Sequence, residues 1–269
     1  MKCQYCGKEY VKNTADLSYM PEFIQEKLRY IPACNCLEKL HEQEMDALRK
    51  KQDEESRMNR VKKFMDISVV DSKFFKSTFE NADMSDKHMK IAKRYADSFL
   101  VKEQKVGMLL YGGVGTGKTY ATACIANYLR EHGKSVFVMN LGLYFNKLKI
   151  EWEKEEKAVL ENVKKCDLLI IDDFGAEMTS NTENVTWRDE KIFNLIDTAY
   201  RSEKPLIIST NLKYHEDLSK CEIEKNLGSR IRDRVVDMCY PIAVIGKSRR
   251  GINKETSVSY THLTLPTIA

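Results

Sequence analysis

The chain has 269 residues, of which 42% are hydrophobic, enough for one large domain with a full core and a small additional module. Its net charge of +4 permits a nucleic-acid partner without requiring one. It has no long apolar run to cross a membrane and no apolar segment near its N-terminus that would direct secretion, so we expect a cytoplasmic protein with reduced or metal-bound cysteines.

Two closely spaced cysteine pairs lie within residues 1–40. Cys3 and Cys6 form a C-x₂-C pair, and Cys34 and Cys36 form a C-x-C pair. Four thiolates complete the tetrahedral shell of a structural zinc ion, and zinc supplies about 10–16 kcal/mol toward folding such small modules. The pattern predicts a zinc-binding module; the alternatives are four free cysteines, or a shell in which His41 replaces one thiolate of the tighter second pair. The other four cysteines lie in predicted helices and strands, where we expect core packing.

Charged residues dominate the segment from His41 to about Met65, which has no glycine or proline. Acid and base pairs at helical spacing support an exposed helix. We therefore expect residues 41–74 to form a charged helical linker. The alternative is a partner-binding helix with a sparse apolar stripe, formed by Met45, Leu48, Met58 and Val61.

From about Phe75 onward, short apolar runs alternate with amphipathic segments. Apolar strands that alternate with helices indicate an α/β fold with a parallel sheet covered on both faces. The predicted strands are 106–112, 135–140, 167–175, 205–211 and 240–246, and the predicted helices are 118–133, 143–165 and 189–203. We assign 75–250 to one domain, and 251–269, which continues none of these patterns, to a disordered or non-native tail.

A phosphate-binding loop follows the first predicted strand. The residues "GGVGTGKT" fit G-x-x-x-x-G-K-[ST], in which backbone N–H groups and a helix N-terminus surround phosphate oxygens. Lys118 is expected to reach the β- and γ-phosphates of ATP, and the Thr119 hydroxyl to bind magnesium. The predicted nucleotide-binding residues are Gly112, Gly113, Val114, Gly115, Thr116, Gly117, Lys118, Thr119 and Asp172.

Polar residues at the ends of two later strands complete the predicted ATPase site. "LLIIDDFG" places two carboxylates at the carboxyl end of a buried strand, where open α/β sheets bind ligands. Asp172 is the predicted magnesium-side acid, and Asp173 the residue that polarises the attacking water; the alternative is a pair of capping or turn aspartates. Asn211 ends the next strand and is predicted to orient water against the γ-phosphate.

Three arginines follow a glycine in "NLGSRIRDRV". We predict that Arg230 is presented to the γ-phosphate bound by a neighbouring subunit, where such an arginine raises turnover by about 10³–10⁵. Arg232 and Arg234 are open to a second interpretation, in which they form surface salt bridges with Asp233 and Asp237.

The order of these motifs resembles that of AAA+ ATPases, and in particular replicative-helicase loaders of the DnaC/DnaI type and the related IstB transposition helpers. The resemblance covers about 75–250 and rests on "TFENAD", "YGGVGTGKT", "LLIIDDFG", "PLIISTN" and "LGSRIRDR". It implies a domain without a full C-terminal lid, in agreement with the 23 residues after Gly246. Arg249 or Arg250 is then a candidate second nucleotide sensor, although a basic tail explains both equally well.

The resemblance also implies contacts with nucleic acid and with a protein partner. In this family a helical element after the second strand contacts single-stranded DNA, so Phe145 is expected to stack on a base and Lys147 and Lys149 to neutralise phosphates. The alternative is ordinary helix packing through Leu143, Leu148 and Ile150. The cysteine module of the family holds the replicative helicase.

We therefore expect a magnesium-dependent ATPase whose subunits associate side by side, with ATP between them, and load a ring helicase onto single-stranded DNA. Two alternatives stay open at this point. One is a transposition helper that binds DNA and recruits a transposase, and the other is an adaptor that binds ATP without hydrolysing it.

Overall fold

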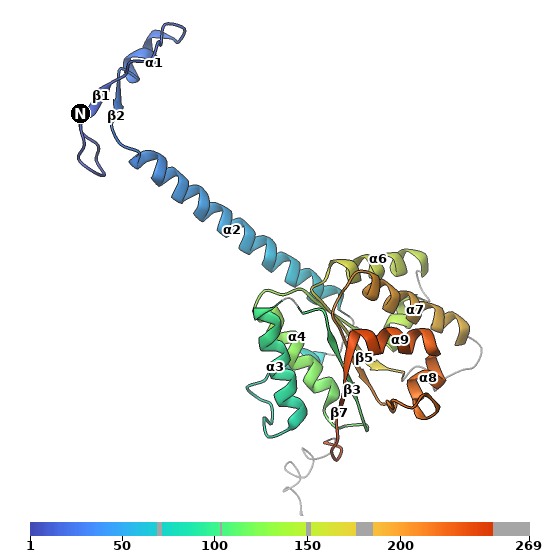
Figure 1. Ribbon diagram of the computed structural model, residues 1–269. Coiled ribbons are helices and arrows are strands. Elements are labelled where there is room, and N and C mark those ends of the chain that lie inside the picture. Colours follow the sequence, from blue (N-terminus) through green and yellow to red (C-terminus); the bar gives the residue numbers. More distant parts are fainter. Residues whose placement is uncertain (69–71, 103, 149–151, 176–184, 250–269) are drawn as a thin grey trace, which may run out of the picture. The chain divides into compact units, whose positions relative to one another are not determined.

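The computed structural model describes residues 1–68, 72–102, 104–148, 152–175 and 185–249 (Figure 1). Contacts divide the chain into two compact units, Met1–Arg57 and Met58–Ala269, called unit 1 and unit 2 below. Helix α2 (Cys36–Ile67) begins in unit 1 and ends in unit 2. The predicted tail at 251–269 lies outside the described residues.

Unit 1 is built on a short antiparallel hairpin. Strand β1 (Tyr10–Lys12) pairs with β2 (Tyr30–Pro32), and α1 (Glu22–Lys27) lies between them in the chain. Before β1 the chain turns at Gly7, which has φ 72° and whose N–H donates to the carbonyl oxygen of Cys3 at 2.8 Å. Because paired strands bring their flanking segments together, the two cysteine pairs meet at one end of the hairpin.

The charged segment predicted as a helix lies within α2. Ion pairs one turn apart support it, as between Glu54 and Arg57 at 2.7 Å. Of the apolar stripe, Val61 is buried in unit 2, where the ring of its neighbour Phe64 also packs on Phe137. The other three stripe residues are exposed: Met45, Leu48 and Met58.

Unit 2 contains a five-stranded sheet in which every pair of neighbouring strands is parallel, which confirms the predicted architecture. Its spatial order is β4-β5-β6-β3-β7. The bounds are β3 (Gly107–Tyr111), β4 (Val136–Asn140), β5 (Leu168–Phe174), β6 (Leu206–Thr210) and β7 (Cys239–Ala243).

Helices cover both faces of this sheet (Figure 1). Successive residues of β5 enter opposite cores, Leu168 and Ile170 on one face and Leu169 and Ile171 on the other, which is why the strand is apolar throughout. The helices are α3 (Lys87–Val101), α4 (Lys118–Glu131), α5 (Leu141–Leu148), α6 (Trp152–Lys165), α7 (Val185–Arg201), α8 (Glu222–Leu227) and α9 (Ser229–Met238), with 3₁₀ turns η1 (Ser72–Lys76) and η4 (Leu218–Lys220). Within the described part of the chain, no helix has both the length and the apolar character that crossing a bilayer requires.

Candidate functional site

The glycine-rich loop connects β3 to α4, as predicted, and its backbone conformation depends on glycine. Gly112, Gly115 and Gly117 have φ values of 152°, 78° and 103°, a region that other residues rarely adopt. A Cβ atom on Gly112 would lie 2.3 Å from the carbonyl oxygen of Val244, and one on Gly115 would lie 2.2 Å from the Ser248 hydroxyl. The loop is therefore closely packed against the segment that follows β7.

Lys118 joins the loop to the end of β6. Its ammonium donates to the carbonyl oxygens of Gly112 at 3.0 Å and Gly113 at 2.8 Å, and to Oδ1 of Asn211 at 2.7 Å. The Asn211 amide in turn donates to Oδ1 of Asp173 at 3.3 Å. Three predicted site residues from three separate elements thus form one hydrogen-bonded series beside the phosphate-binding loop.

The two acids at the end of β5 differ in environment. Asp172 is buried, and burial raises the pKa of its carboxyl, although hydrogen bonds from Ser209 and Thr119 favour the ionised form. Asp173 is half-buried and has φ 59°, and the pairing of β5 with β6 shifts register between Ile171 and Phe174. This local break in the ladder directs the second acid toward the pocket instead of into the sheet.

Ser209 organises both acids and was not predicted from the sequence. Its hydroxyl donates to Oδ1 of Asp172 at 2.5 Å and accepts from the backbone N–H of Asp173 at 3.0 Å. The available signal was the pair of hydroxyl residues, Ser209 and Thr210, that ends the apolar run of β6 before Asn211.

The loop and Asp173 line one pocket of about 510 Å³, whose lining does not include the buried Asp172. Predicted residues on its wall are Val114, Gly115, Gly117, Lys118, Thr119, Asp173 and Asn211. The opposite wall, which sequence reasoning did not assign, comes from the start of α3 and the segment before it: Asn81, Asp83, His88 and Met89. Burial lowers the pKa of His88, so its ring is neutral at physiological pH and can act as a hydrogen-bond acceptor or donor toward a ligand.

Arg249, one of the two candidate sensor arginines, also lines this pocket. Its guanidinium forms an ion pair with Asp86 at the start of α3, and its backbone N–H donates to the carbonyl oxygen of Gly115 at 2.9 Å. Arg250 lies outside the described residues.

The other arginines lie on α9, away from the pocket lining. Arg230 is exposed in the first turn of this helix and lines a separate groove with Asp189 and Phe193. The salt-bridge interpretation holds for Arg232, which contacts Asp233 at 3.4 Å. Arg234 pairs with Asp197 on α7 at 2.6 Å, not with Asp237, and its guanidinium lies 4.6 Å from the centre of the Phe193 ring.

The prediction that Phe145 stacks on a nucleic-acid base does not agree with the structure. Its side chain is 3% exposed and packs against Trp187, with ring centres 5.8 Å apart. The packing alternative holds for Leu148, which is buried in the core, but not for Leu143, which is 41% exposed. Lys147 lies in α5, and Lys149 and Ile150 lie outside the described residues.

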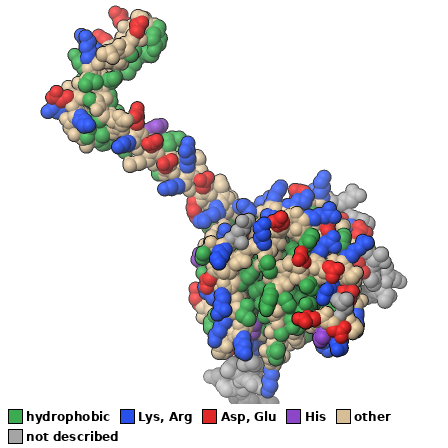
Figure 2. Space-filling view, in the orientation of Figure 1, with side chains coloured by type: hydrophobic (Ala, Val, Ile, Leu, Met, Phe, Trp, Pro, Cys, Tyr) green, Lys and Arg blue, Asp and Glu red, His purple; other side chains and the backbone are tan. Residues whose placement is uncertain are grey.

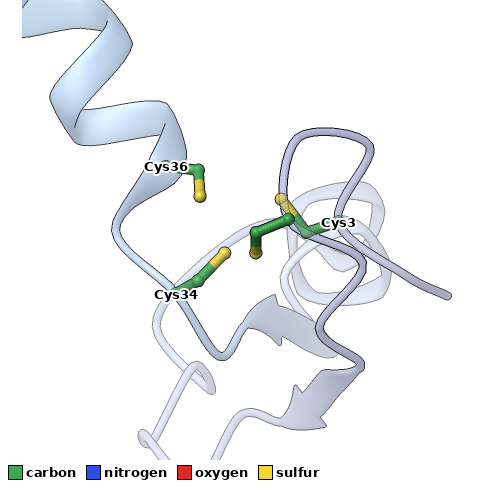
Figure 3. Close-up of side chains that lie close together, drawn as sticks. Cys3, Cys34 and Cys36 are labelled. Carbon is green, nitrogen blue, oxygen red and sulfur yellow. The ribbon is translucent and has the colours of Figure 1, made fainter.

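The four N-terminal cysteines converge as predicted (Figure 3). The sulfur atoms of Cys3, Cys6, Cys34 and Cys36 all lie within 4.8 Å of one another. A tetrahedral zinc site with Zn–S bonds of about 2.3 Å needs sulfur separations of about 3.8 Å, so the arrangement fits zinc with little movement. Cys36 is the first residue of α2, and the turn into this helix lets the short C-x-C pair present both sulfurs. His41 is not a member of the cluster.

The pKa values of these thiols also favour the binding of a cation. Backbone hydrogen bonds from Tyr5 and Cys6 lower the pKa of Cys3 to about 7. Hydrogen bonds with the sulfurs of Cys6 and Cys34 raise the pKa of Cys36 to about 12, with smaller contributions from burial and from the repulsion between neighbouring thiolates. A divalent cation offsets this repulsion, so the cluster fits a metal ion better than four independent thiols.

A parallel sheet with this strand order, a phosphate-binding loop at its carboxyl edge and paired acids beside it define a P-loop nucleotide-binding protein of the AAA+ class. A family model described as "IstB-like ATP binding protein" matches residues 26–257. The chain belongs to this family.

Individual relatives agree with this assignment. The replicative helicase loader DnaI of Bacillus subtilis is 29% identical over 264 residues, which cover 92% of this chain and 78% of the relative. The replicative helicase loader DnaC of Buchnera aphidicola subsp. Schizaphis graminum is 27% identical, covering 67% of this chain and 72% of the relative. A crystal structure of DnaI superimposes on 68% of this chain and 95% of its own, with a TM-score of 0.53 and 26% identity.

Proposed function

We propose that this protein is an ATPase that loads a replicative ring helicase onto single-stranded DNA. The main support for this proposal is the geometry of the site, in which Lys118, Asn211 and Asp173 form one hydrogen-bonded series beside a phosphate-binding loop. The similarity to DnaI extends over 92% of the chain and supports the loader among the functions of this family.

The residues of the pocket divide the work of hydrolysis. Backbone amides of residues 112–117 and the Lys118 ammonium neutralise the phosphates of ATP. The Thr119 hydroxyl and the Asp172 carboxylate would hold magnesium, which offsets charge on the phosphate oxygens. Asp173 and Asn211 position the attacking water, and the hydrogen bond between them restricts both side chains before the substrate arrives.

Measured turnover separates an ATPase from an adaptor that only binds ATP. Asp173→Asn keeps the shape of the side chain and removes the acceptor charge, so we expect turnover to fall by about 10²–10⁴ while ATP binding persists. Asp237→Asn, an exposed residue of α9, is the matched control and should retain full turnover. Equal, undetectable turnover in all three proteins, with and without single-stranded DNA, would favour the adaptor.

Arg230 lies outside the pocket of its own chain, so on this proposal it acts on ATP held by a neighbouring subunit. Arg230→Ala and Lys118→Ala should each be inactive alone, the first for lack of the arginine and the second for lack of phosphate binding. Mixed together, the Lys118→Ala subunit supplies its arginine to the Arg230→Ala subunit, and turnover should return. A mixture as inactive as its components would exclude the shared site.

The partner is tested by affinity capture from host lysate, with the full chain and with a chain that lacks unit 1. Recovery of a hexameric helicase by the full chain alone is the expected result. Recovery of a transposase instead would favour the IstB-like transposition helper. Contact of Lys147 and Lys149 with single-stranded DNA stays a prediction, which crosslinking of Lys147→Ala/Lys149→Ala against the unchanged chain tests.

A further inference from the structure

A basic cleft of about 330 Å³ lies at the edge of the unit 2 sheet where the strands begin, the edge opposite to the phosphate-binding loop. Lysines and two acids line it: Lys102, Lys105, Lys134, Lys204, Asp167 and Glu203. In a parallel sheet all strand starts meet at one edge. The segments before β3, β4 and β6 each carry a lysine two residues before the strand, and the fold brings these three lysines together.

The acids of the cleft already have cationic partners. Glu203 forms an ion pair with Lys105. Asp167 forms an ion pair with Arg60 at 3.0 Å, and also accepts hydrogen bonds from the backbone N–H and the hydroxyl of Ser135, both at 2.7 Å. Two carboxylates therefore face five cations, and the cleft carries an excess of positive charge.

The negative C-terminal ends of the nearby helices explain only some of the lysines in the cleft. Lysines in the last turn of a helix are favoured by its negative end, but the effect fades beyond that turn. Lys134 lies three residues after the end of α4, and Lys204 lies three residues after the end of α7. Both side chains are half-buried at the rim of the cleft.

The positive charge continues beyond the cleft. Arg60 also lines a neighbouring pocket with Lys63 and Lys165, and its guanidinium donates to the carbonyl oxygen of Lys165 at 2.7 Å. Figure 2 shows Lys and Arg side chains gathered over this part of unit 2, near α6. Two adjoining basic pockets form a track, which suits a chain of phosphates better than a single small anion.

We propose that this surface, named here the basic track and formed by Arg60, Lys63, Lys102, Lys105, Lys134, Lys165 and Lys204, binds the phosphodiester backbone of a nucleic acid. It lies apart from the ATP pocket and from α5, so the inference goes beyond the proposed function and does not depend on ATP hydrolysis. Binding is electrostatic and independent of base sequence.

The test measures binding of a fluorescent single-stranded oligonucleotide, and of a duplex of the same length, by fluorescence anisotropy over a series of salt concentrations. The variant is Lys134→Gln/Lys204→Gln. The matched control is Lys90→Gln/Lys225→Gln, which removes the same charge from exposed positions on α3 and α8. ATP affinity, measured on the same preparations, reports separately on the nucleotide pocket.

Each phosphate contact with a single strand contributes a salt slope of about 0.7, so losing two contacts at about 0.1 M salt weakens binding about 25-fold and lowers the slope by about 1.4. Restoring the charge in Lys134→Arg/Lys204→Arg should restore affinity, and ATP affinity should not change. The proposal is overturned if the unchanged protein binds neither probe, if the variant binds as tightly as the unchanged protein, or if the control loses as much.

Discussion

Replacing Ser209 with alanine removes the hydroxyl that joins β6 to both acids at the end of β5. That hydroxyl donates to the buried carboxylate of Asp172 at 2.5 Å. A hydrogen bond to a charged group contributes about 1.5–3 kcal/mol, and 1.36 kcal/mol corresponds to one pH unit. Loss of the donor therefore removes about 1.5–3 kcal/mol of stabilisation from the ionised form, so the pKa of Asp172 rises further.

The sign follows from the role proposed for this acid. Burial already raises the pKa of Asp172, and the hydroxyl opposes that effect by stabilising the carboxylate. Magnesium binds the ionised form, so magnesium-dependent ATP binding is present above the pKa of Asp172 and is lost as the pH falls through it. In Ser209→Ala this loss should occur at a higher pH than in the unchanged protein.

The assay compares ATP affinity with and without magnesium between about pH 5 and pH 8. Thr210→Val is the matched control, because it removes the neighbouring buried hydroxyl, which donates to the carbonyl oxygen of Phe174 at 2.6 Å and does not contact Asp172. Identical pH profiles for Ser209→Ala and the unchanged protein, or an equal displacement in Thr210→Val, would refute the reasoning.

Three further predictions concern stability and metal content. The pKa of Asp172 is raised in the folded state, so its carboxylate lowers stability as the pH rises through that folded value. Asp172→Asn should therefore add on the order of 1 kcal/mol to the free energy of unfolding in urea at neutral pH, and this gain should disappear as the pH falls through the folded pKa of Asp172. The side chain of Lys191 is 4% exposed and pairs with Glu156 at 2.8 Å, so Lys191→Met should lower the free energy of unfolding by about 3–5 kcal/mol. The double variant Lys191→Met/Glu156→Leu should recover most of that stability. An equal loss of stability in both variants would show that the ion pair is not the cause. Cys36→Ser should reduce the zinc content measured by atomic absorption and remove hydrogen-exchange protection from unit 1 alone; full protection after chelation of the metal would contradict a structural zinc site.

The parts of the fold that local pattern determines were predictable. Four strands of the sheet are predicted within one residue of their limits and the last one, β7, within three, because an apolar run bounded by polar residues is a local signal. The same holds for Lys118, whose loop carries its own motif. The cysteine cluster was predictable from spacing alone, although the hairpin that brings its two halves together was not.

What sequence reasoning missed depends on contacts between distant segments. Ser209 acts through Asp172, 37 residues away, and His88 enters the pocket from a helix that carries no motif of its own. Phe145 was misassigned because a helix with apolar residues on several sides does not reveal which one faces the sheet; Trp187 on α7 decides that. The φ of 59° at Asp173 likewise has no signature in the residue type.

The segment after β7 has a practical consequence for anyone handling this protein. It runs beside the glycine-rich loop, with the N–H of Val244 bonded to the carbonyl oxygen of Tyr111 at 2.8 Å and that of Arg249 bonded to Gly115 at 2.9 Å. An affinity tag or surface tether attached just beyond Arg249 would therefore disturb the position of the glycine-rich loop that binds ATP. The same attachment at Met1 would load a separately folded unit and leave that turn undisturbed.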